Sequence, residues 1–422
     1  MLCEVDTTNQ WIRVEPEGAV CGNGSQYKFF VNLSATSDDL VIYFEPGGAC
    51  WDFDSCAGRS GIRGAANPNG LPDDHATAWV DVAGVGSVPV DLVFPPLSGN
   101  AEVTPTADWN KVYVPYCTGD VFAGNRVVVY EDPRGEEPDL EFHHVGHSNT
   151  AAVIEWMNHF FTSVPQMLVT GCSAGGAGSI SNYYFIRNGM EGVDRSYLLN
   201  DSGPVFPAAG ETARSWPMHQ KVRDSWNIDS VLDKVPRGDE LGGDLGRLSE
   251  ILSKEFPDDR LAITYFRLDY NYSLYSYERF YPSSDPTREF LDQRNPLDRA
   301  TFYEFWWEDT EKLRAQHDQR DNLFYYLPFY RDTNSSHCLT IPGFEDAEGD
   351  ILELVGSDPD GLYWVGTEIE TDEGDVTLED FLRNLLDDDR PLASYFEQTC
   401  EGRFQACTPG CWDEEMCLAT GR

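Results

Sequence analysis

The chain has 422 residues, of which 41% are hydrophobic and 13% aromatic, so it contains ample apolar material for a packed core. Its 72 acidic residues against 30 basic ones give a formal net charge of -42, which disfavours binding to nucleic acid or to an anionic membrane surface. No apolar run approaches the roughly 18 residues that a membrane span needs. We therefore expect a folded protein with no membrane span and no nucleic-acid partner.

The cysteines indicate an oxidising compartment. Four of the eleven crowd the C-terminal residues 400–417 with the spacing Cys-x6-Cys-x3-Cys-x5-Cys. A zinc site is the competing interpretation, but the spacing lacks paired C-x2-C knuckles and a nearby histidine, so disulfides are favoured. The odd count leaves at least one thiol unpaired within the chain. The N-terminus shows no signal peptide, so we expect a mature form located outside the cell or in the periplasm.

Short apolar runs that end in loops rich in Gly, Pro or Asp recur along the chain and predict its strands. In chain order they are "DLVIYFEPGGAC" (strand 40–44), "NKVYVPYCTGD", "QMLVTGCSAGG", "SYLLNDSGPV", "LAITYFRLDYN" and "NLFYYLPFYRDTNSSHC". Between the second and third, "SNTAAVIEWMNHFF" has near-helical apolar spacing, with Ser148 or Asn149 as the expected N-cap. Apolar strands alternating with helices predict a mostly parallel sheet with helices on both faces. Ligands bind at the carboxyl ends of such strands.

We expect a single α/β domain over residues 1–398, followed by a Cys-rich tail, residues 399–422, packed on it. Residues 57–107 are rich in Gly, Pro and Asp and predict an irregular excursion. Residues within 211–320 look helical and aromatic, as in "FYEFWWEDTEKL", and are placed as a possible cap over the sheet.

The segment Gly171-Cys172-Ser173-Ala174-Gly175 matches G-x-S-x-G. In this pattern the serine occupies a strained turn between a strand and a helix, where a side chain at either flanking glycine would clash. The turn exposes the hydroxyl, and the following helix presents backbone N–H groups to a developing oxyanion. An apolar strand precedes the motif and a helix-like stretch follows it, so we predict that Ser173 is a nucleophile.

A serine nucleophile needs a base and an acid, which follow it in the order Asp or Glu, then His. Among the later histidines, His337 lies in the loop after the last good strand, whereas His219 and His317 lie in polar helical contexts typical of surface residues. We predict His337 as the base. Asp269 ends the second strand after the serine and is the predicted acid. Asp201, which ends the first, is the alternative and otherwise has a structural or substrate-facing role.

The oxyanion hole needs further backbone donors from the loop after an earlier strand. The loop "PGGAC" supplies glycines that let N–H groups approach a substrate closely. The predicted donors are the amides of Gly48, Ala49 and Ala174.

Several segments together resemble the pectin acetylesterase/Notum family of serine esterases: "FEPGGACWD", "NKVYVPYCTGDVFAGN", "GCSAGGAGSISNYYF" and "NDSGPVF". The resemblance covers roughly residues 19–340 and implies a secreted, disulfide-bonded α/β-hydrolase. In that family, plant members remove acetyl groups from pectin, and the animal relative removes a long acyl chain from a signalling protein. The resemblance therefore implies an ester substrate. Plant members usually read Gly-Gly-Gly-Trp-Cys where this chain reads Pro-Gly-Gly-Ala-Cys, which would open the pocket floor. The resemblance implies the same site residues as the positional argument, namely Ser173, Asp269, His337, Gly48, Ala49 and Ala174.

Other cysteines and histidines are interpreted as structural. Cys172 adjoins the nucleophile but is turned away from the site, so a buried thiol or a disulfide partner is expected. Cys50 and Cys56 are close enough in sequence to pair across the oxyanion loop and stiffen it. The histidines in "EFHHVGHSN" resemble a metal site but more plausibly lead into the next helix. We expect no metal and no cofactor.

The sequence thus predicts a secreted, monomeric serine esterase that removes short acyl groups, such as acetyl, from a polysaccharide. Because the surface is acidic, a neutral or heavily acetylated substrate is easier to bind than a polyanionic one. Two alternatives stay open. One is an esterase of the same fold that acts on longer-chain lipid or polyester substrates. The other is a non-catalytic binding protein built on a hydrolase fold.

Overall fold

The computed structural model describes residues 8–77, 79–82, 86–101, 103–330, 336–341, 367–371 and 374–397. The predicted Cys-rich tail, residues 399–422, lies outside these ranges. Among the described residues, every helix is too short or too polar to cross a membrane.

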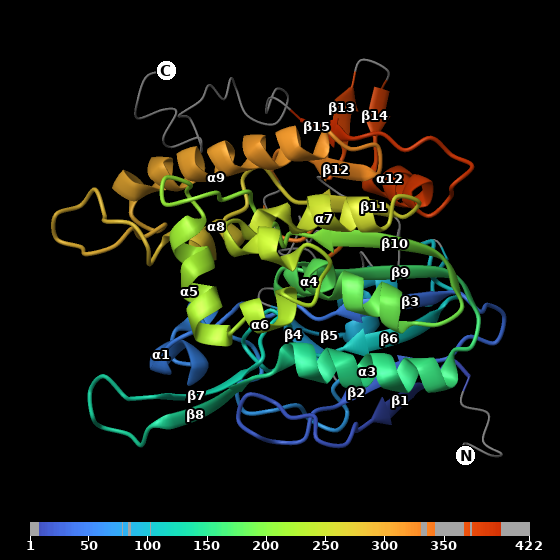
Figure 1. Cartoon of the computed structure of the whole chain (residues 1–422), viewed down its shortest axis with the longest axis horizontal. Helices are drawn as coiled ribbons and strands as arrows, with labels where there is room; N and C mark the ends of the chain where they lie inside the picture. Colours follow the sequence, from blue (N-terminus) through green and yellow to red (C-terminus); the bar gives the residue numbers. More distant parts are fainter. Residues whose placement is uncertain are drawn as a thin grey trace.

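A nine-stranded sheet with the order β1-β2-β6-β3-β9-β10-β11-β12-β15 forms the centre of the fold. Its strands are β1 (Trp11–Val14), β2 (Phe29–Asn32), β3 (Leu40–Phe44), β6 (Asn110–Val114), β9 (Val164–Cys172), β10 (Val193–Asp201), β11 (Arg260–Thr264), β12 (Leu323–Leu327) and β15 (Tyr395–Phe396). The strands from β6 to β15 are parallel, and β1 and β2 are antiparallel at one edge. Figure 1 shows them in this order from bottom to top. The predicted mostly parallel sheet is confirmed.

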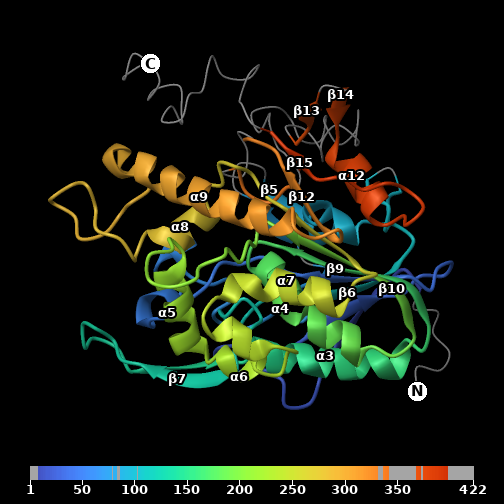
Figure 2. The same cartoon turned by 45° about the horizontal axis from the view of Figure 1, so that its top comes forward.

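Helices and three short ribbons complete the described structure. The helices of eight or more residues are α3 (Gly146–Phe160), α4 (Ala174–Gly189), α5 (Trp216–Trp226), α7 (Leu248–Glu255), α9 (Pro296–His317) and α12 (Leu378–Leu385). Shorter ones are α1 (Phe53–Cys56), α2 (Val90–Val93), α6 (Asp229–Leu232), α8 (Tyr272–Tyr277), η1 (Gly61–Arg63), η2 (Pro95–Leu97), η3 (Gly238–Gly242) and η4 (Leu245–Arg247). The ribbons pair β4 (Trp79–Val82) with β5 (Gly86–Pro89), β7 (Arg126–Tyr130) with β8 (Leu140–His144), and β13 (Ile369–Thr371) with β14 (Gly374–Val376). Figure 2 shows α3, α4 and α7 grouped on one side of the sheet and α12 apart from them.

Strand β3 explains why both faces of the sheet are covered. All five of its residues are buried and apolar. Ile42 and Phe44 pack into the cluster that includes α3 and α4, whereas Val41 packs into the cluster that includes the apolar face of α12. Because successive side chains of a strand point to opposite faces, a continuous apolar run has both faces buried. The burial of both faces of the sheet was therefore predictable from the continuous apolar runs in the sequence.

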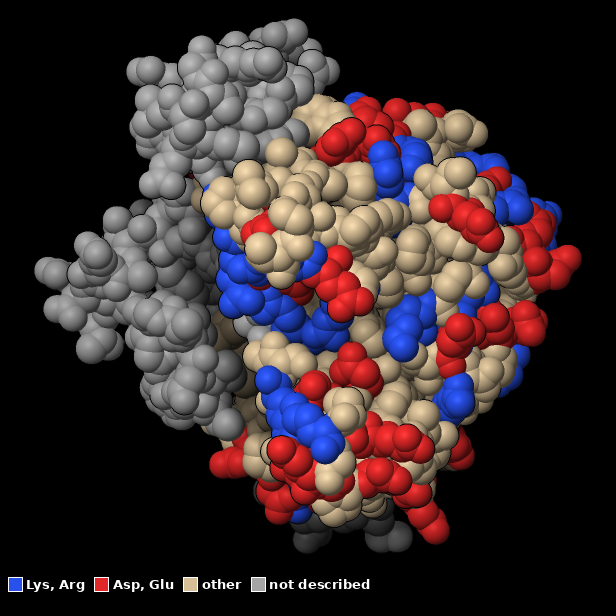
Figure 3. All heavy atoms as spheres, turned by 90° about the vertical axis from the view of Figure 1, so that its left-hand side faces the viewer, with Lys and Arg blue, Asp and Glu red and all other residues tan. Residues whose placement is uncertain are grey.

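The acidic surface is interspersed with arginine. Figure 3 shows Lys and Arg side chains lying among Asp and Glu on one face of the molecule. One pair joins distant segments, since Arg63 Nη2 donates to Glu278 Oε1 at 2.6 Å. Glu278 directly follows α8 and is buried, whereas Arg63 ends η1. The pair therefore ties the excursion after β3 to the segment after β11, and these two segments flank the site described below.

Helix α3 begins at Gly146, before the predicted N-cap residues Ser148 and Asn149, so that prediction is wrong. The first amide of the helix, Gly146 N, donates to Asp120 Oδ2 at 2.8 Å. The Asn149 side chain is used elsewhere, because its Nδ2 donates to Val20 O at 2.8 Å. A carboxylate distant in sequence therefore takes the place of a local cap.

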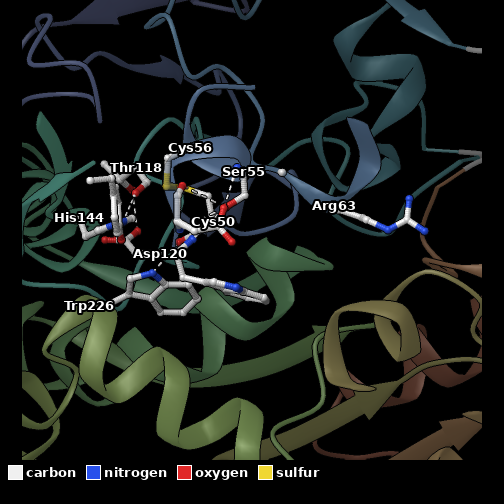
Figure 4. Close-up of a disulfide and its surroundings, with 12 residues drawn as sticks. Cys50, Ser55, Cys56, Arg63, Thr118, Asp120, His144 and Trp226 are labelled. Atoms are coloured by element: carbon white, nitrogen blue, oxygen red, sulfur yellow. Dashed lines mark hydrogen bonds between the residues drawn. A yellow bond between two sulfur atoms is a disulfide. The ribbon is translucent and has the colours of Figure 1, made fainter. Parts of the chain in front are cut away.

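Asp120 is fully buried and connects the loop after β6 to α3 (Figure 4). Its Oδ1 accepts hydrogen bonds from Thr118 Oγ1 at 2.6 Å and Phe122 N at 3.1 Å. Burial raises the pKa of Asp120 to about 6, although these hydrogen bonds and the one from α3 partly oppose the shift.

We expect the Asp120 carboxyl to make stability fall as pH rises from about 4 to about 6. Because its folded-state pKa is raised, the folded protein binds more protons than the unfolded chain in this window. The rise of the Asp120 pKa from its ordinary value to about 6 corresponds to about 3 kcal/mol. The variant Asp120→Asn lacks this titration. Its stability relative to wild type should therefore improve by about that amount between pH 4 and pH 7, as measured by urea denaturation. A difference that is constant with pH would contradict the prediction.

Candidate active site

Ser173 lies in the tight turn between β9 and α4, with φ 57° and ψ -119°. A positive φ is costly for a residue with a side chain and persists only where the surroundings enforce it. A Cβ added at Gly171 or at Gly175 would overlap the carbonyl oxygen of Phe44 on the neighbouring strand. The predicted need for both glycines is confirmed, because the turn packs directly against β3.

His337 and Asp269 form a buried hydrogen-bonded pair. His337 Nδ1 lies 2.7 Å from Asp269 Oδ2, and both side chains are buried. The other carboxylate oxygen, Asp269 Oδ1, accepts from the amides of Asn271 at 2.9 Å and Tyr272 at 2.8 Å. An ionised carboxylate only accepts, so Nδ1 carries the proton and Nε2 is left as the basic nitrogen.

Asp201, the alternative acid, is occupied by the loop that carries the histidine. Its two oxygens accept from Leu339 N at 2.9 Å, Thr340 N at 2.8 Å and Thr340 Oγ1 at 2.6 Å. The next residue, Ser202, accepts at Oγ from Cys338 N at 3.0 Å and donates to Asp201 Oδ1 at 2.9 Å. The carboxylate at the end of β10 therefore anchors residues 338–340, which is a structural role.

A disulfide joins Cys172 to Cys338, with their Cα atoms 5.7 Å apart. Cys172 directly precedes Ser173, and Cys338 directly follows His337. Of the two roles expected for Cys172, a buried thiol or a disulfide partner, the second is confirmed. A ring nitrogen of His337 lies within 4.8 Å of both sulfurs. Disulfide sulfurs are not thiolates, so this cluster is not a metal site while the bond is intact.

Gly48 and Ala49 lie in the loop after β3 and line the same cavity as Ser173 and Ala174. Gly48 has φ +72°, and a Cβ there would overlap Gly64 O and Tyr275 Oη. Ala49 N already donates to Gly64 O at 3.2 Å, a long hydrogen bond, and Tyr275 Oη donates to the same oxygen at 2.7 Å. Ala49 can therefore donate to a ligand only by giving up its bond to Gly64.

The loop that contains these amides is closed by a second disulfide. Cys50 is bonded to Cys56, so the predicted pairing is confirmed. Figure 4 shows Trp226 beside this disulfide, and Trp226 Nε1 donates to Cys50 O at 2.8 Å. The third disulfide, Cys21–Cys117, joins the loop before β2 to the loop after β6. Six of the eleven cysteines are thus paired, and the other five lie outside the described residues.

The histidines of "EFHHVGHSN" bind protein groups. His144 Nδ1 lies 2.9 Å from Thr118 O, and burial lowers the pKa of His144 to about 3. His147 Nδ1 lies 3.0 Å from Asn182 Oδ1. Within the described residues, His143, His144 and His147 do not form a three-residue metal cluster with one another. Cys50, Cys56 and His144 do come together, but the first two form the disulfide.

A cavity of about 800 Å³, counted with its mouth, opens beside the serine. Its wall is mostly apolar and comes from α4, α5, α6, η4, α7, α8 and the loops after β3, β6 and β10. The apolar side chains are Trp51, Val121, Ala123, Ala177, Pro204, Val205, Met218, Val222, Trp226, Ile228, Leu232, Leu245 and Leu248. Three of them, Met218, Val222 and Trp226, recur every four residues along α5. That helical spacing was visible in the sequence, but it did not show which surface the helix covers.

Two histidines predicted at the surface are buried instead, so that prediction is wrong. His219 and His317 are each only 3% exposed. Burial lowers the pKa of His219 to about 3, with a smaller contribution from Arg223, and that of His317 to about 4. Polar sequence neighbours did not indicate exposure here, since Arg223 on the same helix as His219 is itself buried. His219 lines the cavity.

Known proteins of two kinds are similar to this chain. A family profile described as pectinacetylesterase matches residues 96–235. Pectin acetylesterase 4 of Arabidopsis thaliana is 25% identical over 199 residues, covering 46% of this chain and 43% of that protein. Palmitoleoyl-protein carboxylesterase NOTUM of Drosophila melanogaster is 24% identical over 219 residues, covering 49% of this chain and 29% of that protein. The chain thus spans less than half the length of these relatives.

Among solved structures, the Wnt deacylase Notum from Drosophila matches with a TM-score of 0.48 and 18% identity, covering 74% of this chain and 83% of that chain. The resemblance to the pectin acetylesterase/Notum family that the sequence motifs indicate is confirmed by the sequence comparisons.

Replacing Asp201 should destabilise the fold. Asp201→Ala would leave two buried amides and three hydroxyls, those of Thr340, Ser202 and Thr264, without their acceptor, and we expect the free energy of unfolding to fall by at least about 3 kcal/mol in urea denaturation. The matched control is Asp194→Ala, which removes an exposed carboxylate from the same strand and should change stability by less than about 0.5 kcal/mol. Equal effects of the two variants would refute the anchoring role.

Proposed function

We propose that the protein is a serine carboxylesterase that works through an acyl-enzyme. Ser173 is the nucleophile, His337 the general base and Asp269 the group that orients the imidazole. The observation that carries this proposal is the connection of the strained serine turn to the buried His337–Asp269 pair by the Cys172–Cys338 disulfide. Similarity to pectin acetylesterases and to NOTUM carboxylesterases supports the same class of reaction.

In the first half of the reaction, Nε2 of His337 takes the proton of the Ser173 hydroxyl while Oγ attacks the ester carbonyl. The carbonyl oxygen becomes an oxyanion, which accepts hydrogen bonds from the amides of Gly48 and Ala174, and from Ala49 once it leaves Gly64. His337 then gives its proton to the departing alcohol. In the second half, water attacks the acyl-enzyme, His337 removes a proton from that water, and the proton returns to Oγ as the acid leaves.

The cavity favours an acyl chain of several carbons. Its apolar wall would bury such a chain at about 25 cal/mol per Å² of apolar surface removed from water, whereas an acetyl group would leave most of this wall in contact with water. The second candidate is removal of acetyl groups from a polysaccharide, which the similarity to Pectin acetylesterase 4 and Pectin acetylesterase 5 of Arabidopsis favours.

We further propose that the protein acts outside the cytoplasm. Three disulfides join parts of the described chain, and two of them lie at the candidate site. Disulfides persist in oxidising compartments and are rare where thiols are kept reduced.

The first test is hydrolysis of p-nitrophenyl acetate, butyrate, octanoate and palmitate. Ser173→Ala should lower kcat by at least about a thousandfold on every ester, because the nucleophile is lost. Ser148→Ala, which removes an exposed hydroxyl on α3, is the matched control and should retain activity. Wild-type activity that rises from acetate to octanoate supports the longer acyl chain, and a steep fall beyond butyrate supports the deacetylase. If none of the esters is turned over in a way that depends on Ser173, the esterase proposal fails and the non-catalytic binding protein is the remaining alternative.

Filling the cavity should shorten the preferred acyl chain. Met218 is partly buried on the α5 wall, so the larger indole of Met218→Trp can occupy space in the cavity. We expect kcat/KM for octanoate relative to acetate to fall by about tenfold or more, because roughly two chain carbons lose their burial. A ratio equal to that of wild type would mean that the acyl chain does not occupy this cavity.

A further inference from the structure

Among the described residues that line the apolar cavity, one buried side-chain nitrogen has no hydrogen-bond partner. His219 projects from α5 into the wall, and its Nδ1 is buried without a hydrogen-bond partner among the described residues. Two other polar side chains of the lining are engaged: Tyr275 Oη donates to Gly64 O, and Ser276 Oγ donates to Tyr272 O at 3.0 Å. The lining hydroxyls of Ser173, Ser181 and Tyr272 are not among the buried atoms without a partner, so His219 Nδ1 is distinct in being both buried and unbonded.

The imidazole of His219 is neutral, since burial lowers its pKa to about 3. A neutral imidazole has one N–H donor and one acceptor nitrogen. Leaving such a group buried and unbonded is unfavourable, and the missing partner must come from protein, water or ligand. His219 lines the cavity, but Nδ1 itself is covered, so a molecule that occupies the cavity can supply that partner once the ring turns toward it.

We propose that His219 is a specificity-determining residue that recognises a hydroxyl group on the acyl chain, so that the preferred substrates are esters of hydroxy acids. A hydroxyl matches either nitrogen of the ring, because it both donates and accepts. The rest of the cavity provides an apolar surface for the methylene groups of the same chain. This inference rests on the proposed esterase function and narrows its substrate class.

The physical basis is that a plain acyl chain and a hydroxylated acyl chain differ in the hydrogen bonds that they can form in the same cavity. A plain chain leaves the imidazole unbonded. A hydroxylated chain forms the missing bond, and in exchange loses the hydration of its hydroxyl. Without His219, the hydroxyl would be buried against apolar side chains and the hydroxylated chain would be disfavoured. The preference is therefore a property of one side chain and can be removed by one substitution.

The test compares kcat/KM for p-nitrophenyl hexanoate, 3-hydroxyhexanoate and 6-hydroxyhexanoate. In wild type, at least one hydroxylated ester should be used as well as or better than hexanoate. In His219→Phe and His219→Leu, the ratio of that ester to hexanoate should fall by about tenfold. His219→Asn, which keeps a donor and an acceptor, should restore part of the ratio. Met218→Leu, which alters the same wall without removing a polar group, should leave the ratio as in wild type.

Two results would overturn the inference. One is a wild-type preference for hexanoate of tenfold or more over both hydroxylated esters. The other is an unchanged ratio in folded His219→Phe or His219→Leu, with folding checked by circular dichroism, which would mean that water completes the hydrogen bonding of the ring.

A binding measurement separates this inference from the esterase proposal. Calorimetric titration of Ser173→Ala with the three intact esters requires no turnover, so it applies even if the protein is not an esterase. The double variant Ser173→Ala/His219→Phe should bind the hydroxylated ester about tenfold more weakly relative to hexanoate. Equal relative affinities in the two proteins would refute the role of His219 whatever the outcome of the kinetics.

Discussion

The site depends on the attachment of one loop, residues 336–341, to the carboxyl ends of parallel strands. The Asp201 carboxylate at the end of β10 binds the amides and the hydroxyl that follow His337. The disulfide from Cys172 at the end of β9 holds the same loop from the other side. Because these strands are adjacent and parallel, their ends meet at one edge of the sheet. The position of His337, the proposed base, is therefore fixed by the sheet rather than by the loop's own conformation.

This attachment also explains how two aspartates differ: Asp201 is the last residue of β10, whereas Asp269, predicted to end its strand, lies in the loop five residues after β11. Asp269 has one oxygen bound by the amides of its own loop and the other facing the imidazole. Asp201 has both oxygens bound by the histidine loop. The sequence placed both residues at the right edge of the sheet, since each follows an apolar run. It did not contain the register that decides which carboxylate meets the ring, because that depends on where a distant loop crosses the strands.

Elsewhere too, features set by local sequence could be predicted, whereas features set by tertiary contacts could not. The glycines beside Ser173 are a local requirement of a tight turn next to β3, and so they were predictable. The Cys50–Cys56 pair spans only six positions and was also predictable. By contrast, His219 sits among polar neighbours, and its burial follows from the way α5 lies across the cavity. The start of α3 likewise depends on Asp120, which is 26 positions away from Gly146. Tertiary contacts of this kind leave no periodic signal.

The cavity wall and the reacting groups are joined through shared residues. Trp226 contributes its ring to the wall, and its N–H binds the carbonyl of Cys50, one residue beyond the amide of Ala49. Tyr275 lines the same cavity and binds Gly64 O, which also accepts the Ala49 amide. A chain that presses on the Tyr275 ring therefore acts on the oxygen that also accepts the Ala49 amide, the hydrogen bond that Ala49 must release to serve as a proposed oxyanion donor. In the proposed esterase, filling of the wall at Tyr275 and completion of the proposed oxyanion hole are thus coupled through Gly64 O, so a long acyl chain would promote its own removal.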